Sequence, residues 1–159
     1  EEEPNLLLRD NVKMHFTASA WVLNPSKDKV LMLYHNIYQS WSWSGGHADG
    51  EGDLLSVAMK EVKEESGLVS LKPLSDSPIS IEILGVQPHY KKQKYVSAHL
   101  HLNYTFLLHN TKEEKLKICP EENSKVGWLS PDEAVCSSTE AWMKPIYKKL
   151  NQKMRKYLG

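Results

Sequence analysis

Cysteine is scarce in this chain, and long hydrophobic runs are absent from it. The 159 residues include only two cysteines, Cys119 and Cys136, which lie far apart and lack the short spacing of a metal-binding pair. Two separated thiols indicate a reducing compartment rather than a disulfide framework. No apolar run approaches the roughly 18 residues that a membrane span requires, and no signal-like segment opens the chain. We therefore expect a cytoplasmic protein with no membrane partner.

An excess of charge of either sign is also missing. Lys and Arg together number 20, as do Asp and Glu, so the formal net charge is zero. This balance argues against a general binder of nucleic acid or other polyanions. Apolar residues make up 40% of the chain, and a chain of this size buries roughly two thirds of its unfolded surface. We expect a single domain over residues 1–159 that acts as a monomer or a homodimer.

A glycine-rich loop followed by one helix stands at the centre of the sequence. Asp53 is a good N-cap, apolar residues recur after it at helical spacing, and Gly67 can adopt the left-handed conformation that ends helices. These signals predict a helix over residues 54–66. The loop before it contains Gly45 and Gly46, where bare backbone can approach a ligand closely.

Three carboxylates share one edge of this predicted helix. At about 100° per residue, Glu61 and Glu65 are separated by about 40°, and Glu64 lies about 60° to the other side of Glu61. Like charges four residues apart destabilise a helix by roughly 0.2–0.5 kcal/mol, so we expect a positive partner. Lys60 and Lys63 would make this an ordinary solvated helix face. The glycines beside it favour a cation site instead, and hard oxygen ligands suit Mg²⁺ or Mn²⁺ rather than zinc.

These residues resemble the signature of the Nudix hydrolases, which reads Gly, five residues, Glu, seven residues, then Arg-Glu-aliphatic-any-Glu-Glu-any-Gly-aliphatic. Gly46 opens the match and Leu68 ends it. Gly52 stands where the signature has its early Glu, with Glu51 one place before it, and Lys60 stands where the signature has Arg. Lysine keeps the charge but loses the planar fork that grips a carboxylate at two points. The inner positions that follow the signature are Glu61, Val62, Glu64, Glu65 and Gly67.

The resemblance implies an α/β fold, a Nudix-like α/β/α sandwich with a mixed central sheet. It also implies a pyrophosphohydrolase that depends on Mg²⁺ or Mn²⁺ and cleaves the diphosphate linkage of a small-molecule nucleoside diphosphate derivative. By resemblance, the Gly45 carbonyl would hold the metal together with Glu61, Glu64 and Glu65, and Lys60 would support Glu61.

A further carboxylate source lies late in the chain. Glu121 and Glu122 precede a short strand predicted over residues 125–129 and a helix start at Ser130-Pro131. In Nudix proteins a carboxylate from the loop before such a strand joins the metal site or serves as the general base. The resemblance therefore nominates Glu121 or Glu122 beside the three helix carboxylates. An ordinary solvated loop pair is an equal alternative.

Alternating polarity predicts strands on both sides of the central helix. Residues 15–23 and 30–34 flank a turn and predict a hairpin, and residues 79–86 predict a further strand. Residues 95–108 alternate most clearly, with one apolar core face and one polar face. A last helix over residues 139–158 presents an apolar stripe that should dock on the sheet. The stripe consists of Trp142, Ile146, Leu150, Met154 and Tyr157.

Aromatic and imidazole side chains are the candidates for substrate contact. Trp41 and Trp43 could stack on a nucleobase, although large aromatic side chains mostly pack in cores. His47 in the loop could reach a phosphate or lie in solvent. His99 and His101 project from one face of their strand, about 6–7 Å apart. Without a third ligand at a recognisable spacing, this pair favours a wet cleft that hydrogen-bonds substrate over a zinc site.

Two other functions stay open. Isopentenyl diphosphate isomerases also use a Nudix scaffold, but their chemistry relies on a cysteine near the glycine loop, and this chain has none there. The departures at Gly52 and Lys60 leave open a rival of another class, a nucleotide-binding or regulatory module that kept the fold and lost most or all turnover. The sequence does not specify which nucleoside diphosphate derivative is bound.

Overall fold

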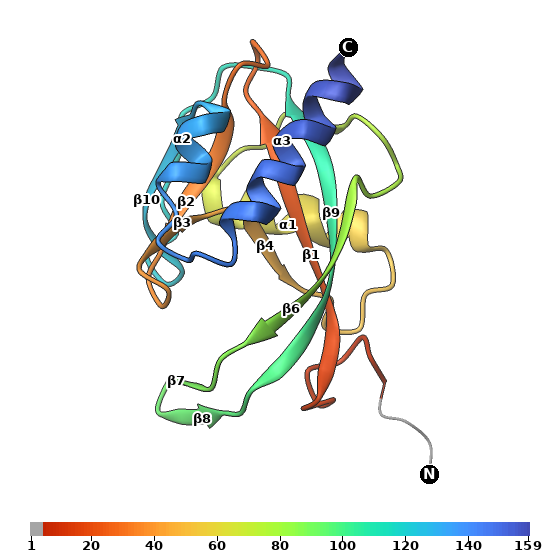
Figure 1. The fold of residues 1–159 in the computed structure, drawn as a ribbon, viewed down its shortest axis with the longest axis vertical. Coiled ribbons are helices and arrows are strands. Elements are labelled where there is room, and N and C mark those ends of the chain that lie inside the picture. The colour runs from red at the N-terminus through yellow and green to blue at the C-terminus, as the bar shows by residue number, and fades with distance from the viewer. Residues whose placement is uncertain (1–4) are drawn as a thin grey trace.

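The computed structural model describes residues 5–159. Most of its strands join one mixed sheet, and two short strands form a separate ribbon that extends from it (Figure 1). The ribbon consists of β7 (His89–Lys91) and β8 (Lys94–Val96). The strands of the main sheet are β1 (Met14–Leu23), β2 (Val30–His35), β3 (Ser40–Ser42), β4 (Ser44–His47), β5 (Leu71–Pro73), β6 (Ser80–Val86), β9 (His99–Asn110) and β10 (Asn123–Leu129).

β1 is the central strand of the sheet. The main path of hydrogen-bonded neighbours runs β10, β2, β1, β9, β5, while β3 pairs with β2, β4 with β1 and β6 with β9. β1 runs parallel to β9 and antiparallel to β2 and β4, which makes the sheet mixed. Leu23 pairs with Val30 across the first turn, so the predicted hairpin is confirmed.

The central helix forms as the sequence predicts. α1 (Leu54–Ser66) begins after Asp53, whose side chain accepts a hydrogen bond from the Ser56 N–H at 3.1 Å. It ends at Gly67, which has a φ of 77°, a conformation that glycine adopts without steric cost. The helix packs on one face of the sheet, against Ala18 and Ala20 of β1. Its buried apolar residues are Val57, Ala58 and Val62.

Two helices cover the opposite face of the sheet, as Figure 1 shows: α2 (Pro131–Cys136) and α3 (Lys144–Leu158). Trp21 of β1 faces this layer, and its ring stacks on Tyr147 of α3 with 5.4 Å between centroids. Alternate residues of β1 therefore enter two separate cores, as strand geometry requires. The expected α/β/α sandwich with a mixed sheet is confirmed. No helix within residues 5–159 has the length and apolar character needed to cross a bilayer.

The prediction for the last helix is wrong in two respects. Helical hydrogen bonding begins at Lys144 rather than near residue 139, because Pro145 marks a helix start and residues 141–143 form a turn before it. The apolar stripe is also shifted. Trp142 and Tyr157 are 61% and 48% exposed, and Tyr147 is buried instead. The buried residues of α3 are Tyr147, Leu150, Asn151 and Met154.

The strand expected over residues 95–108 is interrupted. β8 ends at Val96 and β9 begins at His99, so the first part of this stretch belongs to the ribbon and the rest to the main sheet. The two faces of β9 are also not divided as expected. Leu100, on the face predicted to be core, is 37% exposed, because neither α1 nor α3 reaches that end of the strand.

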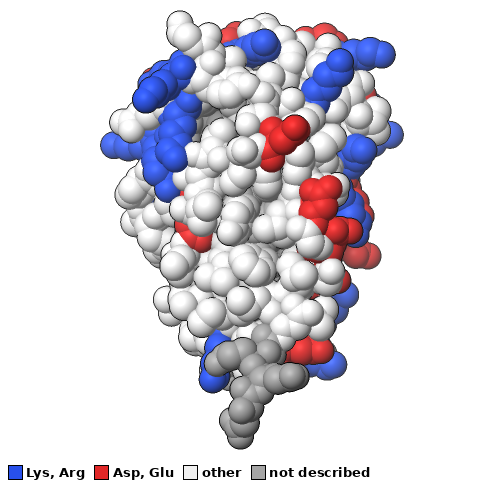
Figure 2. Space-filling model, turned by 90° about the vertical axis from the view of Figure 1, so that its right-hand side faces the viewer, with Lys and Arg blue, Asp and Glu red and all other residues white. Residues whose placement is uncertain are grey.

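Charged side chains are unevenly spread over the surface. On the face shown in Figure 2, basic side chains concentrate in the upper part, toward the end where Figure 1 places the C-terminus, and acidic side chains gather along the right-hand edge. The centre of this face carries little charge. The basic residues of α3 are Lys144, Lys148, Lys149, Lys153, Arg155 and Lys156.

Candidate active site

The short strand β4 lies between two sets of titratable side chains. It pairs antiparallel with β1, where Ala18 lies opposite Gly46. Alternate residues of a strand point to opposite faces. Ser44 and Gly46 therefore face α1, whereas Gly45 and His47 face the other side of the sheet.

Gly46 allows Glu61 to lie directly against the loop. A β-carbon at Gly46 would be 2.3 Å from Cδ of Glu61, so any other residue would displace this carboxyl group. Burial raises the pKa of Glu61, and the charges of Glu64 and Glu122 raise it further, while Lys60 opposes them. Lys60 offsets only part of this rise, so the pKa of Glu61 stays above its ordinary value.

Glu65 is the most buried carboxylate of α1, at 5% exposure. Its Oε1 accepts hydrogen bonds from the Ser44 hydroxyl at 2.8 Å and from the Gly45 N–H at 3.1 Å. Burial raises the pKa of Glu65 to about 8 against the opposing hydrogen bond from Ser44, and the charge of Glu61 adds to the rise. Bound cationic charge would favour the ionised form of this group. The contact that Gly45 makes here uses its N–H, and a metal-ligating role for its carbonyl stays a prediction.

Glu64 points toward solvent and pairs with Lys60. The Lys60 Nζ lies 3.7 Å from Glu64 Oε1, and the two side chains are 70% and 54% exposed. The resemblance implied that Lys60 would support Glu61, whereas this lysine contacts Glu64. An exposed pair of this kind contributes at most about 1 kcal/mol, so Glu64 is free to turn toward the other two carboxylates.

The Nudix signature has a glutamate at the position of Gly52, and the neighbouring Glu51 does not take its place. Its Oε1 accepts a hydrogen bond from the Asp53 N–H at 2.7 Å, which directs the side chain to the start of α1. A β-carbon at Gly52 would meet nothing within 4 Å. The chain therefore has room for a glutamate at position 52 but has none there.

The loop before β10 brings Glu122, and not Glu121, toward the helix carboxylates. Asn123 anchors this loop, because its Nδ2 donates to the backbone oxygen of Glu65 at 2.9 Å. The charge of half-buried Glu122 contributes to the raised pKa of Glu61 and of Glu65. Glu121 is exposed. The sequence could not separate these two neighbours, because the distinction depends on a contact between residues 58 positions apart.

Trp41 and Trp43 pack at the edge of the core. Trp41 meets Tyr34 edge-on at 5.9 Å between centroids, and Trp43 meets Tyr147 edge-on at 5.7 Å. Both rings are half buried against the core beneath α2 and α3. This is the packing that large aromatics usually adopt, and base stacking by these rings stays a prediction.

The structure brings together three histidines that were predicted to contact substrate and a fourth that the sequence reading missed. His47, His99 and His101 surround His15, and the ring centroids lie 4.8–5.1 Å from that of His15. Burial lowers the pKa of His47 and of His101 to about 3, with neighbouring cationic groups adding to the effect. Alternating polarity placed His15 on a strand, but its neighbours depend on strand pairing that the sequence does not reveal.

The polar face of β9 is buried along part of its length. Asn103 and Thr105 are 1% and 0% exposed, and both hydrogen-bond the buried carboxylate of Glu82. Asn103 Oδ1 also accepts from Thr17 and Ser19 of β1 at 2.9 Å. The expectation of a wet cleft along this face is therefore wrong beyond His101, because α3 covers the strand there and the polar groups satisfy one another.

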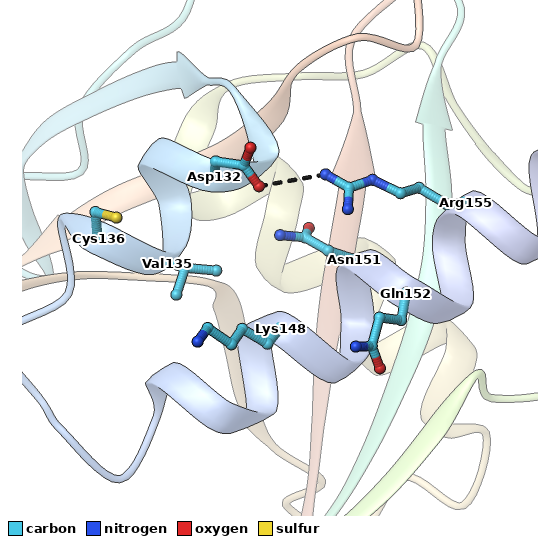
Figure 3. Close-up of a pocket in the computed structure, with 7 residues that line it drawn as sticks. All are labelled: Asp132, Val135, Cys136, Lys148, Asn151, Gln152 and Arg155. Carbon is cyan, nitrogen blue, oxygen red and sulfur yellow. Dashed lines mark hydrogen bonds and ion pairs between the residues drawn. The ribbon is translucent and has the colours of Figure 1, made fainter.

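A surface cavity of about 330 Å³ lies between α2 and α3 (Figure 3). Asp132 and Arg155 form an ion pair at 3.2 Å at its rim, and Cys136 and Asn151 also line it. These helices cover the sheet face opposite α1. The cavity is consequently separate from the carboxylates of the signature.

The sequence matches the model of the NUDIX domain over residues 13–150. Among curated proteins, none matches the chain.

Solved structures of this family share the fold at low sequence identity. A C. elegans Ap4A hydrolase in a binary complex superposes with a TM-score of 0.64 at 18% identity, covering 86% of this chain and 95% of that one. A NUDIX family hydrolase from Clostridium perfringens gives 0.64 at 18% identity, covering 89% and 96%. A MutT protein from Bacillus halodurans gives 0.54 at 23% identity, covering 84% and 79%. Similarities at this level establish the fold.

Proposed function

The chain belongs to the NUDIX family, and from this premise we propose that it hydrolyses the diphosphate linkage of a nucleoside diphosphate derivative with the help of Mg²⁺ or Mn²⁺. The solved relatives include proteins described as an Ap4A hydrolase and a UDP-X diphosphatase. Their substrates are of this general class, which supports the substrate class proposed here.

One observation carries the proposal, the crowding of carboxylates around the glycine loop. Glu61 contacts Gly46 and Glu65 hydrogen-bonds Gly45, and the pKa of each carboxylate is raised by burial and by its acidic neighbours. Buried carboxylates that lie close together are costly to the folded protein when ionised. They fit a divalent cation, which would provide the missing positive charge.

The oxygen ligands of this cluster suit Mg²⁺ or Mn²⁺. In the proposal Glu61, Glu64 and Glu65 hold the ion together with the Gly45 carbonyl. Glu64 reaches this position by leaving its exposed contact with Lys60. When bound, such an ion neutralises the phosphate oxygens and lowers the pKa of water.

The residues of the chain provide the remaining roles. Glu122 lies close enough to influence Glu61 and Glu65 electrostatically, so we assign to it, rather than to Glu121, the acceptance of a proton from the attacking water. Gly46 leaves space for Glu61 and so fixes the position of that carboxylate. Contacts of the nucleoside with the tryptophans or histidines of the sequence prediction stay untested.

A screen of nucleoside diphosphate derivatives, each with Mg²⁺, with Mn²⁺ and with a chelator, tests the proposal. We expect release of a mononucleotide that requires the cation, and a loss in kcat of more than ~100-fold in Glu64→Gln, as for other catalytic carboxylates. Glu113→Gln is the matched control, because Glu113 is an exposed loop carboxylate away from the signature. Hydrolysis without a cation, or full turnover in Glu64→Gln, would contradict the mechanism.

A binding module with little turnover is the second candidate. It is favoured by the empty position at Gly52 and by the Lys60–Glu64 contact, which together leave Glu61 without the bracing that the signature provides. Calorimetry with Mg²⁺ and nucleotide, run beside the release assay, distinguishes the two, because a module would bind without releasing product.

A further inference from the structure

Strand pairing forces four histidines onto one face of the sheet. His15 lies directly beside His101 in the parallel pairing of β1 and β9, and His99 precedes His101 by two residues. His47 on β4 lies opposite Thr17, two residues after His15. Residues two apart on a strand point to the same face, so all four imidazoles project together, away from α1.

Three of these imidazoles are close enough to share one ion. One ring nitrogen each from His15, His47 and His101 lies within 4.8 Å of the other two. Within residues 5–159 this is the only set of three histidine, cysteine, aspartate or glutamate ligands that converges so tightly. The carboxylates of α1 do not form such a set in their present conformation.

Hydrogen bonding assigns the free lone pair of His15 to its buried Nε2. His15 Nδ1 lies 3.0 Å from the backbone oxygen of Asn11, and because a carbonyl only accepts, Nδ1 carries the proton and Nε2 the lone pair. His15 is 4% exposed, and its buried Nε2 has no hydrogen-bond partner among the described residues. A buried acceptor without a partner is rare in folded proteins and calls for an explanation.

His99 orients His101 in the same way that outer partners orient metal ligands. His99 Nδ1 donates to the Ser97 backbone oxygen at 2.8 Å, and its Nε2 lies 3.1 Å from Nε2 of His101. A neutral His99 ring therefore accepts the Nε2 proton of His101. This leaves the lone pair of His101 on Nδ1. A fixed tautomer held by a second hydrogen bond is the usual condition of a histidine that binds metal.

The electrostatics of the cluster also suit a cation. Burial keeps His15, His47 and His101 neutral by lowering the pKa of each, and neutral imidazole is the metal-binding form. Arg9 and Asp49, whose charges act in opposite directions on the pKa of His47, are paired with each other at 2.7 Å. A donor set of imidazole nitrogens alone suits zinc, cobalt, nickel or copper and is poorly matched to Mg²⁺.

We propose that His15, His47 and His101 bind one first-row transition metal ion, such as Zn²⁺, with His99 as the positioning residue for His101. This site lies on the opposite side of β4 from the carboxylates of α1. It goes beyond the proposed hydrolase activity and does not depend on it. Sequence spacing alone could not reveal it, because its three ligands come from three strands.

Metal titration of chelator-treated protein tests this site without any substrate. We expect Co²⁺ to give visible absorption bands that saturate at one ion per chain, and Zn²⁺ to displace it. His47→Ala and His101→Ala should each weaken binding by more than ~100-fold, and His99→Ala by about 10- to 100-fold, as outer-shell changes do. These three side chains are half buried, so their replacement is less disruptive than replacement of His15, and circular dichroism verifies folding.

His109→Ala is the matched control. It removes another half-buried imidazole of β9, one whose Nε2 contacts the Pro25 backbone oxygen at 3.2 Å, and it should bind Co²⁺ as the wild type does. Absence of Co²⁺ and Zn²⁺ binding by the wild type would overturn the proposal. So would binding that His47→Ala and His101→Ala leave unchanged, or binding that Glu64→Gln abolishes. A change in nucleotide affinity without any metal binding would assign these histidines to substrate contact instead.

Discussion

Two clusters of titratable side chains lie on opposite sides of β4, and burial acts on them in opposite directions. On the side of α1, burial raises the pKa of Glu61 and Glu65, which favours the protonated form of each. On the other side, burial lowers the pKa of His47 and His101, so that protons are lost. Both clusters are therefore driven toward neutrality by the same physical cause.

The comparison shows how one short strand can separate two kinds of ligand. Gly46 makes room for a hard carboxylate on one side, and His47, the next residue, contributes a softer imidazole on the other. Successive residues of a strand alternate between its two faces. Two neighbouring residues therefore suffice to place the carboxylates and the imidazoles on opposite sides of the sheet. The predictions below alter one side at a time.

Gly46→Ala should have the largest effect, and only on the carboxylate side. The added β-carbon would overlap Glu61, which lies 2.3 Å from its position, and a displacement of about 1 Å in a catalytic group can cost ~100-fold in turnover. We expect such a loss in kcat with Mg²⁺, measured on the best substrate of the screen. Gly85→Ala is the control, because its β-carbon would meet nothing within 4 Å. Wild-type turnover in Gly46→Ala would show that Glu61 is not held as described.

Glu65→Gln should remove a loss of stability that occurs between pH 4.5 and about 8. The folded-state pKa of Glu65 is raised from 4.5 to about 8, so the folded protein holds the proton more tightly than the unfolded chain. The stabilisation is complete below pH 4.5 and is lost as pH rises to about 8, by at most about 1.4 kcal/mol per pH unit. Urea unfolding across this range should show a smaller slope in the variant. An unchanged slope would contradict the raised pKa.

His47→Gln should change the pH dependence of stability in the opposite direction, on the acidic side. Here the folded-state pKa falls from 6.5 to about 3, so the unfolded chain binds the proton more tightly. The stability is present above pH 6.5 and is lost as pH falls toward 3, again by at most about 1.4 kcal/mol per pH unit. The acid side of the unfolding profile should become flatter in the variant, with His109→Gln as the control for loss of an imidazole. A flattening between pH 6.5 and 8 instead, where only Glu65 titrates, would mean that the two clusters are not separate.

Restoring the two residues of the Nudix signature should raise kcat by less than Gly46→Ala lowers it. It should leave the histidine cluster unchanged. Gly52→Glu combined with Lys60→Arg supplies the missing carboxylate and the two-point grip of a guanidinium, and position 52 is open enough to accept it. We expect kcat to rise about 10-fold, equivalent to roughly 1.4 kcal/mol of barrier, with unchanged Co²⁺ binding. No gain would mean that the natural residues already support full turnover.

Arg9→Gln should have the smallest effect. Arg9 forms two hydrogen bonds to Asp49, at 2.8 and 2.7 Å, beside the histidines, but both side chains are 50% exposed. Exposed ion pairs contribute about 1 kcal/mol or less, and we expect a loss of this size in urea unfolding. A loss of unfolding free energy well above this size would show that this pair is essential to the loop.

Local signals determined how much could be read from the sequence. α1 was predicted to its ends because Asp53 and Gly67 act within the helix itself. The start of α3 was predicted wrongly because apolar spacing continued through Trp142 without a capping residue. Glu122 and His15 owe their surroundings to contacts between distant segments. Spacing within one strand or helix carries no information about such contacts.

Equilibrium binding of Mn²⁺ to protein already loaded with one equivalent of Zn²⁺ tests the separation of the two clusters most directly. Free Mn²⁺ can be counted by electron paramagnetic resonance. We predict that the zinc-loaded protein still binds Mn²⁺, that Glu64→Gln loses this binding, and that His101→Ala loses zinc but retains Mn²⁺. Displacement of Mn²⁺ by zinc, or loss of both ions in either variant, would contradict the account.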